Sequence, residues 1–248
     1  MNPSEYQALF EVETTHWWFE ALRREVRRAL ESARLPLGAA YLDAGCGTGG
    51  LLAALPWKGF GVDASLLGAG LAARRRLTRI ACADVTRMPF LDARFDAATS
   101  IDVLCHRAVR EEAALRELFR CLRPGGLLVL QVPAFQALRG PHDDAVWTNR
   151  RYRRGEIRDL LEGAGFRARQ LRYRNALLFP AAALWRLLRR GRRRRTAAVS
   201  DVAPVPRVFN AALGAVAAFE ARLSRAGVRF PAGLSVFAVA EKPGGGSR

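Results

Sequence analysis

The stretch from Tyr41 to Gly50, which reads YLDAGCGTGG, constrains the fold of this chain more than any other. An apolar run ends at Asp43, closely spaced glycines follow, and residues 51–55 then read as the start of a helix. Glycine permits unusual backbone angles and lets the chain approach a ligand closely. The N-terminus of a helix presents free N–H groups. A strand, a glycine turn and a helix in this order predict a nucleotide-cofactor loop.

The glycine spacing alone leaves the identity of the cofactor open. Gly45, Gly47 and Gly50 satisfy G-x-G-x-x-G, the dinucleotide pattern. Gly45, Gly47 and Gly49, preceded by Asp43, also give D-x-G-x-G-x-G. A carboxylate at the end of the strand suits a cationic cofactor better than a pyrophosphate. S-adenosylmethionine, which carries an ammonium and a sulfonium and no phosphate, fits that preference.

The formal net charge of +17 over 248 residues invites a nucleic-acid interpretation. However, Lys58 and Lys242 are the only lysines, so almost all of the positive charge is arginine. A bias towards arginine and alanine is typical of GC-rich genomes. We therefore discount the charge and expect no nucleic-acid partner.

Cysteine usage and hydropathy predict a cytoplasmic protein. The four cysteines form no C-x-x-C pair, so we expect reduced structural thiols and no metal site. The N-terminus has no apolar signal segment. No apolar run reaches the roughly 18 residues that span a bilayer.

Later motifs repeat the arrangement of an apolar run closed by an acid. Asp63 closes a second run 20 residues after Asp43, and Asp84 closes a third. Pro124, Gly125 and Gly126 then form a turn into an apolar run typical of a fully buried strand.

These motifs together resemble the class I S-adenosylmethionine-dependent methyltransferases, strongly over about residues 16–173. The resemblance implies an α/β fold: a Rossmann-like, seven-stranded, mostly parallel sheet with an antiparallel last strand and helices on both faces. It also implies a helical flap over residues 1–38 and a methyltransferase domain over 39–248. Within that domain, residues 175–230 are expected to form a helical insertion or lid before the last strand.

The resemblance assigns the cofactor contacts residue by residue. Asp63 is expected to accept the ribose hydroxyls, and Asp84 a hydrogen bond from the adenine amino group. The full expected set is Asp43, Gly45, Cys46, Gly47, Gly49, Asp63, Ala64, Asp84, Val85 and Ile101.

Methylation of a hydroxyl requires a base, and a neutral imidazole suits that task near pH 7. Of the three histidines, we predict His142 first and His106 second, with Asp143 as the orienting acid. Each histidine can equally serve only to bind or to support its loop. The chain departs from the family at Cys105, where many relatives have glutamate, and at Trp147, where one subgroup has a further histidine.

Two segments leave alternatives open. The aromatic run from His16 to Phe19 either packs its rings on the domain or forms a flap that turns Arg23 or Arg24 towards the cofactor carboxylate. Residues 175–195 resemble an interfacial helix that meets anionic lipid through arginines. The same residues also fit a lid with a solvated arginine loop, or a dimer surface.

The sequence therefore favours a methyltransferase for a small-molecule, sugar or lipid-linked acceptor, with O-methylation assisted by histidine. It acts in the cytoplasm, at the inner face of the membrane if the interfacial helix binds there. The alternative is an RNA methyltransferase that uses the arginine-rich surface. A third hypothesis is a protein that binds the cofactor without turnover.

Overall fold

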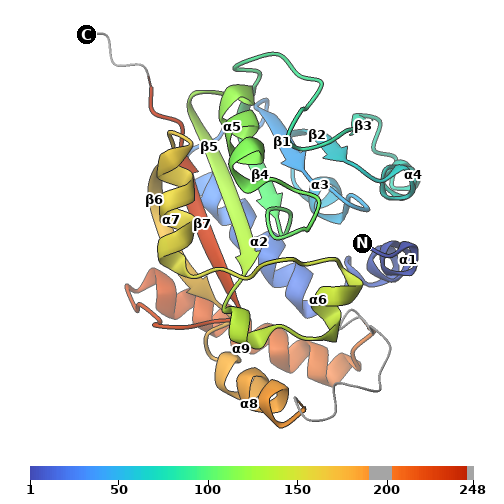
Figure 1. Ribbon diagram of the computed structural model, residues 1–248, viewed down its shortest axis with the longest axis vertical. Coiled ribbons are helices and arrows are strands. Elements are labelled where there is room, and N and C mark those ends of the chain that lie inside the picture. Colours follow the sequence, from blue (N-terminus) through green and yellow to red (C-terminus); the bar gives the residue numbers. More distant parts are fainter. Residues whose placement is uncertain (190–202, 245–248) are drawn as a thin grey trace.

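Seven strands form one sheet in the computed structural model, which describes residues 1–189 and 203–244 (Figure 1). The strands are β1 (Ala40–Ala44), β2 (Lys58–Asp63), β3 (Ile80–Cys82), β4 (Phe95–Ile101), β5 (Leu122–Pro133), β6 (Arg167–Arg174) and β7 (Ser235–Glu241). The helices are α1 (Pro3–Val12), α2 (Trp17–Ser32), α3 (Gly50–Ala54), α4 (Leu66–Arg74), α5 (Glu111–Cys121), η1 (Gln136–Leu138), α6 (Pro141–Ala145), α7 (Arg154–Gly163), α8 (Phe179–Arg189) and α9 (Arg207–Arg225).

The sheet has the order β3-β2-β1-β4-β5-β7-β6. Strands β1 to β5 pair in parallel, whereas β7 is antiparallel to both β5 and β6. The expected Rossmann-like sheet with an antiparallel last strand is therefore confirmed. The chain order reverses between β1 and β4, and in open α/β sheets this is where ligands bind, beyond the carboxyl ends of the strands.

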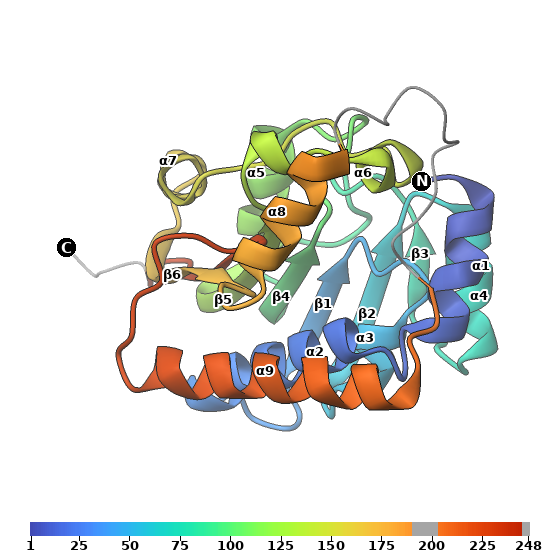
Figure 2. The same cartoon turned by 90° about the horizontal axis from the view of Figure 1, so that it is seen from below.

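Helices cover both faces of the sheet (Figure 2), and each face has its own apolar core. On one face Val26 and Leu30 of α2 pack with Leu52 of α3 against the strands. On the other face Leu115 and Leu118 of α5 lie in one core with residues of α7. Helices on both faces bury β1 completely, which explains why β1 reads as a continuous buried run.

The segment before the last strand consists of α8 and α9, which lie beyond the carboxyl end of β5 (Figure 1). Helix α8 begins at Phe179 and not at Asn175 as the sequence indicated, because Asn175 has a positive φ of 55° that cannot continue a helix. The predicted arginine cluster at 192–195 lies outside the described residues.

Helix α9 is fastened to the start of α2. The side chain of Asn210 accepts a hydrogen bond from the Trp17 N–H at 2.8 Å and donates one to the Thr15 carbonyl at 3.0 Å. The helix also carries Glu220, a buried residue that accepts a hydrogen bond from the Leu177 N–H at 2.9 Å. Within 1–189 and 203–244, no helix combines the length and apolarity needed to cross a membrane.

Candidate functional site

The glycine loop leaves β1 at Ala44 and enters α3 at Gly50. Gly45 and Gly49 have φ values of 86° and 80°, in the left-handed region that favours glycine. A Cβ atom on Gly45 would lie 2.1 Å from Val103, and one on Gly49 would lie 2.5 Å from Leu77. Val103 and Leu77 therefore pack so closely against the loop that a side chain is excluded at both positions.

Four carboxylates lie at the carboxyl ends of four neighbouring strands. Asp63 is the last residue of β2, and Asp43 is the last but one of β1. Asp84 lies two residues after β3, and Asp102 lies one residue after β4. The recorded hydrogen-bond donors to all four are uncharged. Among the described residues, none of the four forms an ion pair, although the chain carries 40 lysines and arginines.

Asp43 lies deepest in this row. Its Oδ1 accepts a hydrogen bond of 2.6 Å from the Thr99 hydroxyl, and the Tyr41 hydroxyl lies 2.5 Å from the same Thr99 oxygen. Burial raises the pKa of Asp43 to about 7, and the Thr99 hydrogen bond opposes that rise. A cation above the loop would favour the ionised form of this acid.

Asp63 fixes the loop from the next strand. Its Oδ2 accepts from the Gly47 N–H at 2.9 Å, and its Oδ1 accepts from the Ser65 N–H at 2.9 Å. The Tyr6 hydroxyl donates to Oδ1 at 3.2 Å. The carboxylate therefore joins the glycine loop, the start of α4 and helix α1.

The remaining predicted cofactor residues lie along the same edge. Asp84 is exposed and accepts a hydrogen bond from the Thr86 N–H at 2.8 Å. Ala64 is exposed and follows β2, Val85 is buried, and Ile101 ends β4. Cys46 is buried within the loop, where its N–H donates to the Val62 carbonyl at 2.9 Å.

Helix α1 lies over the glycine loop. Leu9 is the nearest neighbour of a Cβ built on Gly47, at 3.6 Å, and the Tyr6 ring lies against Gly68. Buried Glu13 contacts the Thr48 hydroxyl and pairs with Arg75 at 2.9 Å. The sequence did not assign Tyr6 or Glu13 to the site, because nothing local in α1 indicates what it covers.

Arg23 and Arg24 of α2 both have partners within the protein. Arg23 donates to the main-chain carbonyls of Glu13 and Thr14, which follow α1. Arg24 pairs with Glu20 on the exposed surface at 2.8 Å. These two arginines tie down the α1–α2 connection and the outer face of α2.

The donor set fits S-adenosylmethionine on its own chemistry. Free carboxylates at neighbouring strand ends suit the positive charges of this cofactor. A dinucleotide would bring a negatively charged pyrophosphate to the glycine loop, where Asp43 near the end of β1 would repel it.

The predicted catalytic residues fall on two segments beyond β4 and β5. His106 follows β4, and an isolated bridge joins it to Thr148. Burial, the N-terminal ammonium and Arg107 lower the pKa of His106 to about 4, so it is neutral at pH 7. His142 lies half-buried in α6. Both remain predictions as bases.

Asp143 has partners that the sequence did not indicate. Its carboxylate accepts from Arg151 Nε at 2.8 Å, from the second Arg151 nitrogen at 3.0 Å, and from the Gly140 N–H at 2.7 Å. Both residues are buried. These bonds fix α6 to the segment that precedes α7, and the role of Asp143 as an orienter of His142 stays a prediction.

Asp102 follows β4 directly and was not assigned to the site from the sequence. It ends an apolar run in the same way as Asp43 and Asp63, and that repetition is the signal that could have identified it. Its φ of 55° is uncommon for a residue other than glycine. Gln131 donates to its Oδ2 at 3.1 Å.

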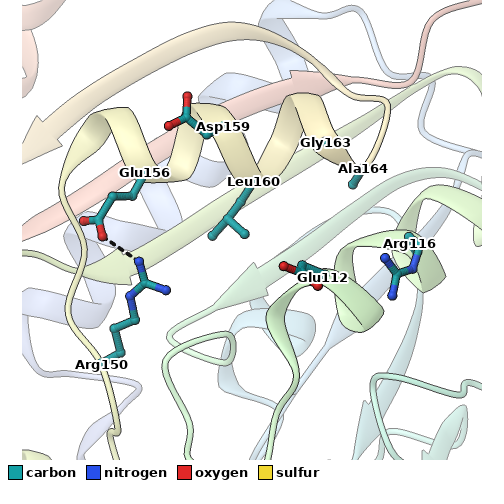
Figure 3. Close-up of a pocket in the computed structure, with 8 residues that line it drawn as sticks. All are labelled: Glu112, Arg116, Arg150, Glu156, Asp159, Leu160, Gly163 and Ala164. Atoms are coloured by element: carbon teal, nitrogen blue, oxygen red, sulfur yellow. Dashed lines mark hydrogen bonds and ion pairs between the residues drawn. The ribbon is translucent and has the colours of Figure 1, made fainter.

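A separate surface pocket of about 450 Å³ lies between α5 and α7 (Figure 3). Its wall carries an ion pair between Arg150 and Glu156, and none of the predicted site residues lines it. This pocket is therefore distinct from the edge of the sheet that carries the four carboxylates.

Comparisons with known proteins agree with this geometry. Residues 14–171 match the family described as a methyltransferase domain. The 24-methylenesterol C-methyltransferase 2 of Oryza sativa subsp. japonica is 29% identical over 195 residues, which are 70% of this chain and 53% of that protein. The tRNA (carboxymethyluridine(34)-5-O)-methyltransferase alkbh8 of Xenopus tropicalis is 32% identical over 140 residues, 47% of this chain and 21% of that protein.

Solved structures share the fold across nearly the whole chain. A SAM-dependent methyltransferase of Thermotoga maritima, described as a possible histamine N-methyltransferase, superposes with a TM-score of 0.59 at 18% identity. The superposition covers 96% of this chain and 95% of that one. By contrast, the chain spans about half the length of the rice sterol enzyme.

Proposed function

This chain belongs to the class I S-adenosylmethionine-dependent methyltransferases, and from that membership we propose that it O-methylates a small-molecule, sugar or lipid-linked acceptor. The observation that carries the cofactor part of the proposal is the row of four carboxylates, none of which pairs with an arginine in the described part of this strongly basic chain. Such a row attracts a cation to the switch point of the sheet.

The cofactor residues take the roles that the family resemblance implies. Asp63 receives the ribose hydroxyls and Asp84 the adenine amino group, while Val85, Ala64 and Ile101 line the same edge. When bound, S-adenosylmethionine supplies an electrophilic methyl group on a positively charged sulfur. Helix α1 excludes water from the loop, since Leu9 and Tyr6 already cover Gly47 and Gly68.

Proton removal from the acceptor is assigned to His142, or to His106. An imidazole serves as a base when its pKa is near the working pH. The lowered pKa of His106 makes it the weaker base of the two candidates at pH 7. Arg151 holds α6, and with it His142, against the segment that follows β5.

Helices α8 and α9, which we place beside the acceptor, favour an apolar or membrane-borne substrate. Phe179 of α8 lies 5.5 Å from Phe135, ring centre to ring centre, so α8 packs against the loop that follows β5. Several large apolar side chains of α8 and α9 are exposed, namely Leu184, Trp185, Val208, Phe209 and Phe219. Contact of this apolar surface with an anionic membrane is part of the proposal.

A second candidate function is methylation of RNA, which the likeness to the tRNA methyltransferase favours. Binding of RNA through arginines would weaken steeply with salt. Retention on RNA that is lost between low and moderate salt, together with methyl transfer to that RNA, would replace the small-molecule assignment.

Calorimetric titration with S-adenosylhomocysteine, run beside NADH, tests the cofactor assignment directly. Micromolar binding of S-adenosylhomocysteine alone is expected. Binding of NADH alone would overturn the proposal. A positive result justifies a screen of sterol, quinone, sugar and RNA acceptors with a labelled methyl donor.

A further inference from the structure

A chain of buried polar side chains leads from the carboxyl end of β4 to helix α2. Asp102 accepts from Gln131 Nε2 at 3.1 Å, and Gln131 Oε1 accepts from an Arg174 nitrogen at 3.1 Å. Arg174 Nε in turn donates to Glu25 at 3.2 Å. The four residues come from the end of β4, from β5, from β6 and from α2.

The inner members of this chain are fully enclosed. Gln131 is 0% exposed and Arg174 is 1% exposed, the largest fully buried side chain in the protein's described part. Burying an arginine is costly unless it is paired and hydrogen-bonded. Arg174 meets that condition with Glu25, Gln131 and the Trp18 carbonyl at 3.3 Å, and its guanidinium lies 5.2 Å from the centre of the Trp18 ring.

Asp102 is the outermost of these four hydrogen-bonded residues. This residue is exposed, whereas the other three are buried. Its main-chain N–H donates to the Gln131 carbonyl at 2.8 Å, so Gln131 holds both the main chain and the side chain of Asp102. The next residue, Val103, packs under Gly45 of the cofactor loop. Asp102 therefore lies beside the cofactor loop at the switch point of the sheet.

We propose that Gln131 and Arg174 are positioning residues that hold the Asp102 carboxylate ionised and aimed at the methionyl ammonium of the cofactor. This inference rests on the proposed function. The adenosine end is assigned to Asp84 and Asp63 on β3 and β2. The methionyl end then lies towards β1 and β4, where Asp102 is the carboxylate nearest the surface.

The surroundings of Asp102 explain why it needs support. Although Asp102 is an exposed residue, the protein packed around its carboxylate desolvates it and raises its pKa to about 6. The Gln131 hydrogen bond, Arg174 and Arg151 lower the pKa of Asp102, and Asp143 raises it. The Cys105 thiol donates to the Asp102 carbonyl at 3.1 Å, and burial raises the pKa of that thiol, so it stays neutral. Among the described residues, Gln131 makes the direct hydrogen bond to the Asp102 carboxylate, so loss of Gln131 removes that support for the ionised form.

The first test titrates the carboxylate itself. Protein labelled with 13Cγ-aspartate is followed by NMR against pH, and the Asp102 signal is assigned by its loss in Asp102→Asn. Gln131→Leu should shift the Asp102 midpoint upward by about one pH unit, the scale of one hydrogen bond to a charged group. An unmoved midpoint in folded Gln131→Leu would overturn the proposal.

Gln131→Glu separates positioning from simple packing. The new carboxylate still accepts from Arg174, but it offers Asp102 no donor and adds a negative charge. The proposal expects a larger upward shift of the Asp102 midpoint than in Gln131→Leu. A merely structural role predicts the opposite, recovery of wild-type behaviour. Arg174→Lys, which keeps the buried charge, should lie between wild type and Gln131→Leu.

The second test compares two ligands by calorimetry at pH 7. S-adenosylhomocysteine carries the ammonium, whereas 5′-methylthioadenosine lacks the amino-acid end. Asp102→Asn and Gln131→Leu should weaken the former about tenfold or more and leave the latter within about twofold. Equal losses for both ligands would refute the assignment to the ammonium. No binding of either ligand to wild type would instead refute the proposed function.

Discussion

The Tyr6 hydroxyl donates a hydrogen bond to the Asp63 carboxylate across 3.2 Å, which joins α1 to the end of β2. Burial raises the pKa of Tyr6 to about 12, and the Asp63 charge adds to that rise, so the hydroxyl stays protonated and remains a donor at working pH. The helix over the cofactor loop and the proposed ribose acceptor are therefore one hydrogen-bonded unit.

Asp63→Ala should weaken binding of S-adenosylhomocysteine about tenfold to a hundredfold, because charge-assisted hydrogen bonds to the ribose and to the loop are lost together. Tyr6→Phe is the matched control, since it keeps the ring against Gly68 and removes only the hydroxyl. It should change the affinity less than about fivefold. Unchanged affinity of Asp63→Ala by calorimetry would contradict the ribose assignment.

The stability of the free protein should depend on the ionisation of Asp43. Its pKa of about 7 lies above the usual aspartate value, so the folded state binds more protons than the unfolded state between those values. The contribution of Asp43 to the free energy of unfolding is therefore full at low pH. It falls as pH rises towards 7, by up to about 1.4 kcal/mol per pH unit.

Urea unfolding of wild type and Asp43→Asn from pH 4.5 to 7.5 measures that contribution. The asparagine keeps an acceptor for the Thr99 hydroxyl and removes the charge. The free energy of unfolding of Asp43→Asn, relative to that of wild type, should increase as the pH is raised across this range. Parallel pH profiles would show that Asp43 is ionised throughout.

Asp143→Ala should destabilise the fold by about 3–5 kcal/mol, because it leaves Arg151 buried without its partner. Asp144→Ala is the neighbouring control. Asp144 pairs with Arg139 on the exposed surface, so its loss should cost less than about 1 kcal/mol. Thermal and urea unfolding of the two variants give the comparison, and similar losses would show that the Arg151 pair is not the stronger one.

His142→Ala should lower methyl transfer about a hundredfold to ten-thousandfold, the usual contribution of a general base, with unchanged binding of S-adenosylhomocysteine. His106→Ala should lower it less, because the lowered pKa of His106 makes it a poor proton acceptor at pH 7. The assay follows transfer from labelled donor to the acceptor found by screening. The reverse ranking would move the base to His106.

Phe209→Glu and Leu184→Glu should reduce sedimentation with anionic phosphatidylserine vesicles without loss of stability, since both side chains are more than half exposed. Val228→Glu provides a control at an exposed apolar residue that lies outside both helices. If wild type fails to sediment with these vesicles, the membrane contact is withdrawn.

The cofactor edge was predictable because its signals are local. Each of Asp43, Asp63 and Asp84 follows its own apolar run, and parallel strands bring such residues to one edge. The polar chain from Asp102 to Glu25 was not predictable, because Gln131 and Arg174 read as ordinary strand residues. Only the pairing of β5 and β6 with β7 brings them to one face of the sheet. The pairing of Asp143 with Arg151 was not predictable for a different reason, because it depends on the path of the loop between α6 and α7.

The place of β7 in the sheet determines the order in which the strands can pair while the protein is being synthesised. Strand β6 pairs with β7 alone in the described structure, and β7 comes more than 60 residues after the end of β6. While the chain leaves the ribosome, β1 to β5 can associate early, but β6 must wait for residues 235–241. Until then Arg174 lacks its place beside Gln131, and the nascent chain holds an incomplete sheet in which the edge of β5 is open.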